Sequence, residues 1–391
     1  MRRTRRARRL GATALVVMVA GGCTSGPILA NAPLVAHNPP SPTPAAARLP
    51  DPQAIVLPRD DGPHDRLTEW WYFTGHLEAD DGSHLGFEAV VFRAQRGDAP
   101  VTWASHLALT DESDGRFLYA QRAAIGTAPD ASPRDASGAP TGFDLRVPAP
   151  AEPGVAPDAG AWRLQGSGDL ATIDAALSPA EATVAGGSFG LHLALKANKP
   201  AVLHDGNGWV DFGPAGGSYY YSRTRITVTG AADLGAGPMH VTGEAWFDHQ
   251  WGDFISVGGG GWDWFAVNLD DWSELTLSLV RNADGSLPLV YGTSVDANGT
   301  ATHLDRPDFT VTATGAWTSP TTGATYPAGW SIAVPGQDLA ITLTPTIPDQ
   351  ELDTRPTTGV VYWEGSQRVQ ATRAGTALGG EAYVELTGYA K

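Results

Sequence analysis

Side chains that could carry chemistry gather between residues 243 and 265. This stretch holds four of the thirteen tryptophans, together with three aspartates, a glutamate and a histidine. A carboxylic acid that apolar surroundings keep protonated can donate a proton to an alkene carbon, and aromatic faces can stabilise the resulting carbocation. We therefore expect cofactor-free acid–base chemistry, hydration or cyclisation, from the candidate catalytic residues Asp248, His249, Trp251, Asp253 and Asp263.

A β-strand through this stretch would turn its side chains alternately to its two faces. His249 and Trp251 would then share one face, whereas Asp248 and Trp246 would share the other. Asp248 and His249 therefore cannot both line one interior unless a β-bulge intervenes. An equally weighted interpretation is structural, with the two side chains satisfying buried backbone groups at a junction between domains.

The first element expected to position such groups is a β-hairpin over residues 69–93. Apolar and polar residues alternate in both of its arms, which is typical of half-buried strands. A register that pairs Leu77 with Leu85 would put Glu69 opposite Arg93. We expect this carboxylate and arginine to form an ion pair that plugs the end of a barrel, an arrangement that does not require contact with a ligand.

A second hairpin over residues 263–281 is expected to repeat the arrangement, with Asp263 opposite Arg281. Because the motifs at residues 70–73 and 262–265 resemble each other, two similar domains in tandem follow. Evenly spaced antiparallel strands of this number close into barrels or sandwiches, and a barrel of about eight strands leaves a cup for one small apolar ligand.

The N-terminus predicts export. Residues 1–22 combine six arginines with an apolar run and a small-residue cleavage site, as in a signal peptide. Cys23, the only cysteine, follows in a context that resembles the lipobox of bacterial lipoproteins, so we expect it to carry a lipid. Residues 24–52 are rich in proline, alanine and serine, and we expect residues 23–60 to form a flexible tether. Domains are then expected over 61–245 and 246–391.

Composition excludes several classes of function. The formal net charge is −16, and loss of the six leader arginines would lower it to −22. This charge argues against binding to nucleic acid or electrostatic attraction to anionic lipid, so the lipid anchor should supply membrane attachment.

His106 and His204 are isolated, no cluster has the close spacing of a zinc site, and we expect neither metal nor cofactor. Ser222 lacks a nucleophile-elbow context, which disfavours acyl-enzyme chemistry.

Several separated motifs make the chain recognisable. From about residue 63 to the end it resembles the AttH and carotenoid 1,2-hydratase family, and the segments that carry the resemblance are Glu-Trp-Trp-Tyr-Phe at 69–73, Tyr-Tyr-Ser-Arg-Thr-Arg at 220–225, Gly-Glu-Ala-Trp-Phe-Asp-His-Gln-Trp-Gly at 243–252, Tyr-Trp-Glu-Gly at 362–365 and Gly-Tyr at 388–389.

The resemblance implies an all-β fold of two tandem lipocalin-like antiparallel β-barrel domains. It also implies a role for the His-x-Trp pair at His249 and Trp251, which carotenoid hydratases share. Those hydratases use a tyrosine and an aspartate one strand further on, but here no tyrosine follows before Tyr291. Other members of the family are exported bacterial proteins, some of them encoded beside an ABC transporter.

We therefore expect an exported, lipid-anchored protein of the cell envelope that binds a hydrophobic, isoprenoid-like or lipid-like small molecule. Any chemistry that it performs should be cofactor-free acid–base catalysis of the hydratase or cyclase type, and the alternative is a non-catalytic accessory or carrier lipoprotein that serves an ABC transporter permease. The expected ligand-binding residues, drawn from the aromatic strands and from hairpin ends, are Glu69, Trp71, Tyr72, Tyr221 and Trp264.

Overall fold

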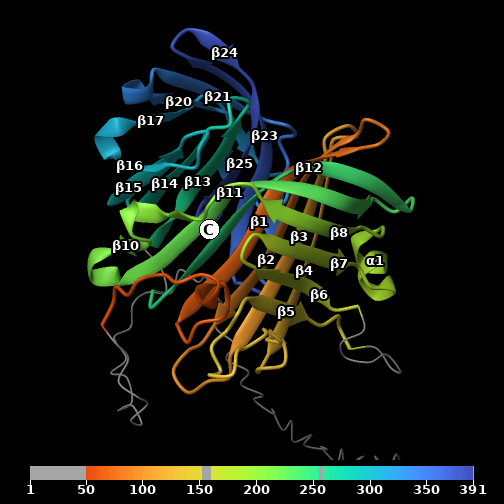
Figure 1. Ribbon diagram of the computed structural model, residues 1–391. Coiled ribbons are helices and arrows are strands. Elements are labelled where there is room, and N and C mark those ends of the chain that lie inside the picture. The colour runs from red at the N-terminus through yellow and green to blue at the C-terminus, as the bar shows by residue number, and fades with distance from the viewer. Residues whose placement is uncertain (1–49, 152–159, 255–258, 391) are drawn as a thin grey trace, which may run out of the picture.

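The computed structural model describes residues 50–151, 160–254 and 259–390. Almost every element is a β-strand, and the strands form two large antiparallel sheets that stand side by side (Figure 1). The first sheet curls into a nearly closed barrel, in which the end strands β4 and β5 approach each other, and the second forms a half-barrel. The expected all-β fold with two barrel-like sheets is confirmed.

The first sheet contains, in spatial order, β4 (Arg116–Ile125), β3 (Thr102–Asp111), β2 (His84–Ala94), β1 (Thr68–Ala79), β12 (Pro238–Gly252), β11 (Gly217–Asp233), β8 (Gly190–Ala197), β7 (Leu170–Ala176), β6 (Trp162–Ser167) and β5 (Phe143–Val147), with β9 (Val202–Leu203) and β10 (Trp209–Asp211) paired to β11. The second contains β16 (Ala301–Asp305), β15 (Leu289–Val295), β14 (Glu274–Asn282), β13 (Gly259–Leu269), β25 (Gly380–Thr387), β23 (Val361–Arg373), β21 (Leu339–Pro345), β20 (Trp330–Val334) and β17 (Thr310–Ala313), with β22 (Glu351–Asp353) and β24 (Thr376–Leu378) paired to β23.

Minor elements complete the described fold. They are the hairpin of β18 (Ala316–Thr318) and β19 (Thr325–Pro327), the helix α1 (Pro179–Ala185) and the 3₁₀ turns η1 (Arg59–Asp61), η2 (His204–Gly206), η3 (Gly213–Ala215), η4 (Arg306–Asp308) and η5 (Pro335–Gln337). Among the described residues, no helix has the length and apolar character needed to cross a membrane.

The register expected for the first hairpin is confirmed, because Leu77 pairs with Leu85 and Glu69 faces Arg93. The ion pair expected between these last two residues is not formed. The Glu69 carboxylate instead binds two histidines inside the barrel, and Arg93 donates to the Arg66 carbonyl and to Gln95.

The register expected for the second hairpin is wrong by two residues, since Asp263 faces Leu279. The connection is shorter than expected: the Leu269 N–H donates to the Ser273 carbonyl, and Glu274 already belongs to the strand. Arg281 nevertheless forms an ion pair with Asp263, as expected, because its long side chain reaches along the sheet.

Residues 50–60 of the expected tether and the expected domain boundary lie in the described part of the chain. Near its end, the segment expected as tether over 23–60 packs on the first barrel, since Ile55 and Leu57 contact the core and Asp60 is buried. The boundary expected between 245 and 246 lies inside β12, which pairs with β1 and β11 up to Gly252. The expected signal peptide and Cys23 lie outside the described residues.

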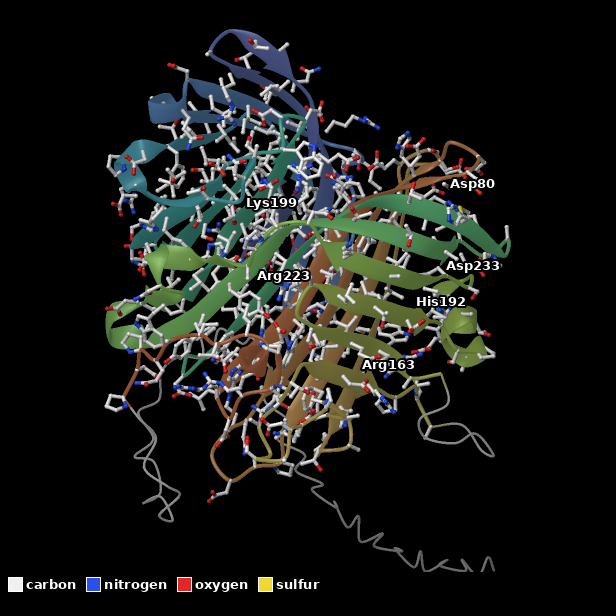
Figure 2. The ribbon with its side chains drawn as sticks, in the orientation of Figure 1. Asp80, Arg163, His192, Lys199, Arg223 and Asp233 are labelled. Carbon is white, nitrogen blue, oxygen red and sulfur yellow. The ribbon has the colours of Figure 1, made fainter. Side chains whose placement is uncertain are left out.

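A buried charge network joins the two sheets. Lys199, which follows β8, donates from Nζ to both carboxylate oxygens of Glu274 in β14, at 2.8 and 2.9 Å. Arg225 of β11 donates to the same carboxylate at 2.7 Å and to Glu244 at 2.6 Å. Figure 2 places Lys199 at this junction. The network links the two sheets, and a cavity lies elsewhere along the same junction.

Candidate active site between the two sheets

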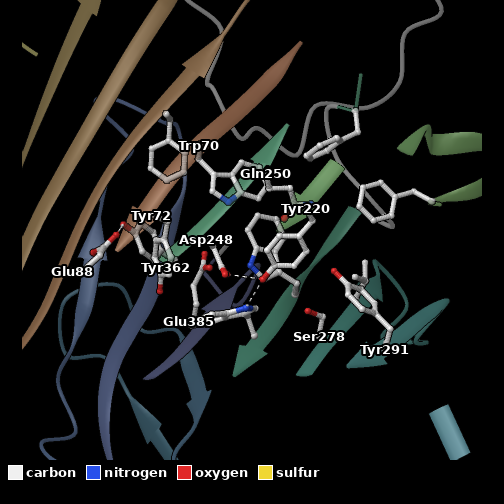
Figure 3. A pocket seen from close by; sticks show the side chains of 16 residues that line it. Trp70, Tyr72, Glu88, Tyr220, Asp248, Gln250, Ser278, Tyr291, Tyr362 and Glu385 are labelled. Atoms are coloured by element: carbon white, nitrogen blue, oxygen red, sulfur yellow. Dashed lines mark hydrogen bonds between the residues drawn. The ribbon is translucent and has the colours of Figure 1, made fainter. Parts of the chain in front are cut away.

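A cavity opens between the outer face of the first barrel and the second sheet (Figure 3). The volume of this cavity, its open mouth included, is about 900 Å³. Ten of its sixteen lining residues are aromatic, so the walls are mainly apolar. Strands β1, β2, β11 and β12 supply one wall, and β13, β14, β15, β23 and β25 supply the other.

Strand alternation decides which side chains reach this cavity. On β12, Asp248 and Gln250 face it, whereas the intervening His249 points into the first barrel. On β13, Trp262 and Trp264 face it in the same way. The prediction that Asp248 and His249 lie on opposite faces of one strand is confirmed.

Asp248 is the most elaborately bonded carboxyl group of the cavity. It accepts hydrogen bonds from the Tyr220 hydroxyl and from the Trp246 indole, each at 2.6 Å, and a third from the Ser222 hydroxyl. Burial raises the pKa of Asp248 to about 6, although the three donors oppose that shift. Near neutral pH this group can therefore both hold and release a proton.

A hydrogen-bonded chain continues behind Asp248. Because the Ser222 hydroxyl donates to Asp248, the Nε2–H of His204 must donate to Ser222 Oγ, at 2.6 Å. His204 Nδ1 then accepts from the hydroxyl of Thr293 in the second sheet, at 3.0 Å. Burial lowers the pKa of His204 to about 3, so this imidazole is neutral at physiological pH.

Two further lining carboxyl groups have raised pKa values. Burial raises the pKa of Glu88 to about 8, against a hydrogen bond that the Tyr362 hydroxyl donates at 2.8 Å. Glu385 is partly exposed to the cavity, and its apolar surroundings raise its pKa to about 7. Behind the wall, the Tyr72 hydroxyl donates to the Glu364 carboxyl group. Burial raises the pKa of Glu364 well above its usual value.

The predicted site residues divide between separate places. Asp248, Tyr72 and Trp264 meet in the cavity. The others point elsewhere: Glu69, Trp71, Tyr221, His249 and Trp251 lie inside the first barrel, Asp253 pairs with Arg66, and Asp263 bonds Arg281 and Tyr389.

Sequence reasoning did not place Glu88, Glu385 or Tyr362 at the site. Of the three consecutive tyrosines at residues 219–221, it chose the wrong one for the cavity. Tyr220 lines the cavity, whereas Tyr221 donates to the buried Asp61 inside the barrel at 2.5 Å. A glutamate with apolar residues on both sides in the sequence, as at Glu88 and Glu385, was the available signal, because a buried unpaired charge is costly unless it serves a purpose.

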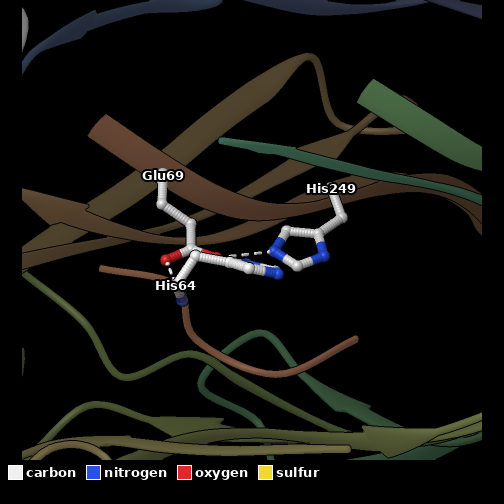
Figure 4. Close-up of side chains that lie close together, drawn as sticks. All are labelled: His64, Glu69 and His249. Carbon is white, nitrogen blue, oxygen red and sulfur yellow. Dashed lines mark hydrogen bonds and ion pairs between the residues drawn. The ribbon is translucent and has the colours of Figure 1, made fainter. Parts of the chain in front are cut away.

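Inside the first barrel, Glu69 lies between two imidazoles (Figure 4). Glu69 Oε1 is 2.7 Å from His64 Nδ1 and 3.0 Å from His249 Nε2. Within the described part of the chain, this is the group whose spacing could hold a metal ion, and sequence spacing did not reveal it because Glu69 and His249 are far apart in the chain. Burial opposes a charge on His64, but Glu69 and Asp60 outweigh it and raise the pKa of His64. An internal ion pair accounts for this arrangement.

The protein is therefore an all-β protein of two barrel-like sheets, with an aromatic cavity that carries carboxyl groups between them. The chain belongs to the AttH-like family, whose profile matches residues 48–389. No protein with a curated description matches it.

Solved structures support this assignment. A crystal structure assigned to AttH from Nitrosomonas europaea is 30% identical, covers 88% of this chain and 99% of its own, and has a TM-score of 0.71. Kievitone hydratase from Nectria haematococca is 14% identical, with coverage of 85% and 93% and a TM-score of 0.59. CghA with Sch210972 is 12% identical, with coverage of 83% and 89% and a TM-score of 0.50. The last two show a shared fold.

Proposed function

We propose that the protein binds a hydrophobic, isoprenoid-like small molecule in the cavity between the sheets, and that Asp248 adds a proton to an alkene carbon of this ligand. The observation that carries the proposal is a buried carboxyl group with a pKa of about 6 in a wall made largely of aromatic rings. Apolar walls favour the neutral acid, and aromatic faces favour the cation that protonation creates.

The proposed reaction is the addition of water to a carbon–carbon double bond. The proton of Asp248 forms a new C–H bond at one alkene carbon, and the π electrons leave a carbocation at the other. A water oxygen attacks this carbocation, and the proton that the water loses returns to the Asp248 carboxylate. Atoms and charge balance without a cofactor, and the donors Tyr220, Ser222 and Trp246 stabilise the carboxylate between the two proton transfers.

The similarity to kievitone hydratase supports the proposal at the level of the scaffold, since a protein of this fold carries that name. The reaction itself is argued from the cavity of this chain, because one fold hosts many functions.

The test is turnover in ¹⁸O-labelled water, with a panel of acyclic isoprenoids and prenylated phenols. We expect an alcohol product that contains one labelled oxygen, and we expect Asp248→Asn to abolish turnover while the variant still binds substrate. His249→Gln alters the neighbouring residue on the opposite strand face, and a folded variant should retain turnover.

The opposite pattern would reject the proposal. Turnover that survives in Asp248→Asn but is lost in folded His249→Gln would move the chemistry into the first barrel, to the His-x-Trp pair. Tight binding by the unaltered chain without any turnover would limit its function to carrying the ligand, as in the alternative of an accessory lipoprotein.

A further inference from the structure

Among the described residues that line the cavity, those that can carry a charge near neutral pH are all carboxylic acids. Three described lining residues, Glu88, Asp248 and Glu385, carry carboxyl groups, and no described lining residue is a lysine, arginine or histidine. The tyrosines of the wall do not ionise near neutral pH, because burial raises the pKa of Tyr72, Tyr220 and others well above the usual value.

The histidines behind the wall add no positive charge. His106 contacts the Tyr362 hydroxyl at 2.6 Å, and His204 contacts Ser222. Burial lowers the pKa of both imidazoles to about 3. Any charge that the described groups place at this cavity near neutral pH is therefore negative.

One oxygen of a buried lining carboxyl group lacks a hydrogen-bond partner. Glu88 is fully buried, and its Oε2 has no hydrogen-bond partner, although its Oε1 accepts from Tyr362. Glu364, which accepts a hydrogen bond from the lining residue Tyr72, also has an Oε2 without a partner. Buried polar atoms without partners are rare in native proteins, and a bound water or ligand is one explanation for them.

We propose that this cavity selects among apolar ligands by charge, and that it prefers a molecule carrying a positive charge, such as a tertiary or quaternary ammonium ion, while it excludes apolar anions such as fatty acids. The aromatic faces and the carboxylates attract the same sign of charge. This inference rests on the proposed function and deepens it, because an ammonium ion resembles the carbocation of the proposed reaction.

The test compares three probes of similar shape by calorimetry on the full chain: benzyltrimethylammonium, its neutral carbon isostere neopentylbenzene, and phenylmethanesulfonate. We expect the ammonium ion to bind about tenfold more tightly than the neutral isostere at pH 8, as one cation–π contact with a desolvated ring allows. We expect the sulfonate not to bind.

The preference must depend on pH. Burial raises the pKa of all three carboxyl groups, to about 6 for Asp248, about 7 for Glu385 and about 8 for Glu88, so the negative charge at the cavity grows as pH rises from about 5 to about 8. The ratio of ammonium to neutral affinity should therefore be small at pH 5 and should grow towards pH 8. Glu385→Gln should reduce this ratio at pH 8, whereas the exposed Asp114→Asn, which makes the same change in net charge, should not.

Two results would overturn the inference, and they are distinguishable. A neutral isostere that binds as tightly as the ammonium ion at every pH would reject charge selection but leave the proposed function standing. Failure of all three probes, together with the isoprenoid panel, would remove the binding site itself. The pH series on the unaltered chain decides the question even where a variant fails to fold.

Discussion

Asp248 combines two opposing influences on one carboxyl group. Burial favours the neutral acid, and three hydrogen-bond donors favour the carboxylate, so that its pKa lies at about 6. An acid in this range suits proton transfer in both directions, because neither state is strongly favoured near neutral pH. The donors are therefore expected to control the acidity of the site as well as its geometry.

Ser222→Ala should raise the pKa of Asp248, since it removes a donor that stabilises the ionised form. A hydrogen bond to a charged group is worth about 1.5–3 kcal/mol, so the expected rise is about one to two pH units. The measurement is an infrared titration of the protonated carboxyl band that disappears in Asp248→Asn. Ser218→Ala is the matched control, because Ser218 is a buried serine of the same strand that donates elsewhere. An unchanged titration in Ser222→Ala would show that this hydrogen bond does not set the acidity.

Glu88 makes the stability of the fold depend on pH. Its pKa is about 8 in the folded protein, against an ordinary value of 4.5, so folding favours its protonated form. This stabilising contribution is fully present below the ordinary pKa and is lost as pH rises through about 8. The urea midpoint of the unaltered chain should therefore fall more between about pH 5 and about pH 9 than that of Glu88→Gln. Parallel pH profiles would contradict the assignment of a raised pKa to Glu88.

At the scale of elements, strand faces and registers decide what the sequence could predict. The first hairpin was predictable because its two arms are close in the chain and its apolar faces match in one register. The second was misplaced by two residues because its four-residue connection, with Trp272 in the left-handed region, lacks glycine or asparagine as a marker.

The division of the site between two faces of β12 was also predictable, but not which face borders a cavity. That depends on the second sheet, which packs against the outer face of the first barrel through long-range contacts that local patterns do not reveal. Tyr220 was missed for this reason, since its face is set by pairing with Gln250. The tryptophans that appeared to form one cluster, Trp251 and Trp264, accordingly lie in different compartments.

The charge network between β8, β11 and β14 should be essential to the junction. Lys199, Arg225 and Glu274 are buried. Glu274→Gln would leave Lys199 without its carboxylate partner and would remove one of the two carboxylate partners of Arg225. Breaking a buried ion pair on one side costs about 3–5 kcal/mol, so the free energy of unfolding should fall by about this amount. Asp114→Asn, at an exposed ion pair, should cost at most about 1 kcal/mol. Urea denaturation measures both, and equal effects would show that the network does not hold the sheets together.

At the scale of the whole molecule, two separate cores leave their outer faces to form the site. The first barrel is filled by side chains such as Trp71, Phe73 and Phe247, and the second sheet has its own core around Phe265. The aromatic cavity therefore lies between the sheets rather than within the core of the first barrel, which departs from the cup expected of a single lipocalin-like barrel.

We propose that a lipid on Cys23 anchors the chain to a membrane of the cell envelope. Cys23→Ala should move the protein from the membrane fraction to the soluble fraction of its host, because no other lipid-bearing cysteine exists in the sequence. Fractionation with immunodetection measures this change. Membrane attachment that persists in the variant would contradict the anchor.

The most direct test of the ligand cavity is native mass spectrometry of the protein purified from its own host, followed by organic extraction. Ser278 lines the cavity, and Ser278→Phe should fill it, whereas Thr372→Phe places the same ring at an exposed strand position. We predict a stoichiometric apolar molecule on the unaltered chain and on Thr372→Phe, and none on Ser278→Phe. A molecule retained by folded Ser278→Phe, or no molecule on any of the three, would contradict a ligand site between the sheets.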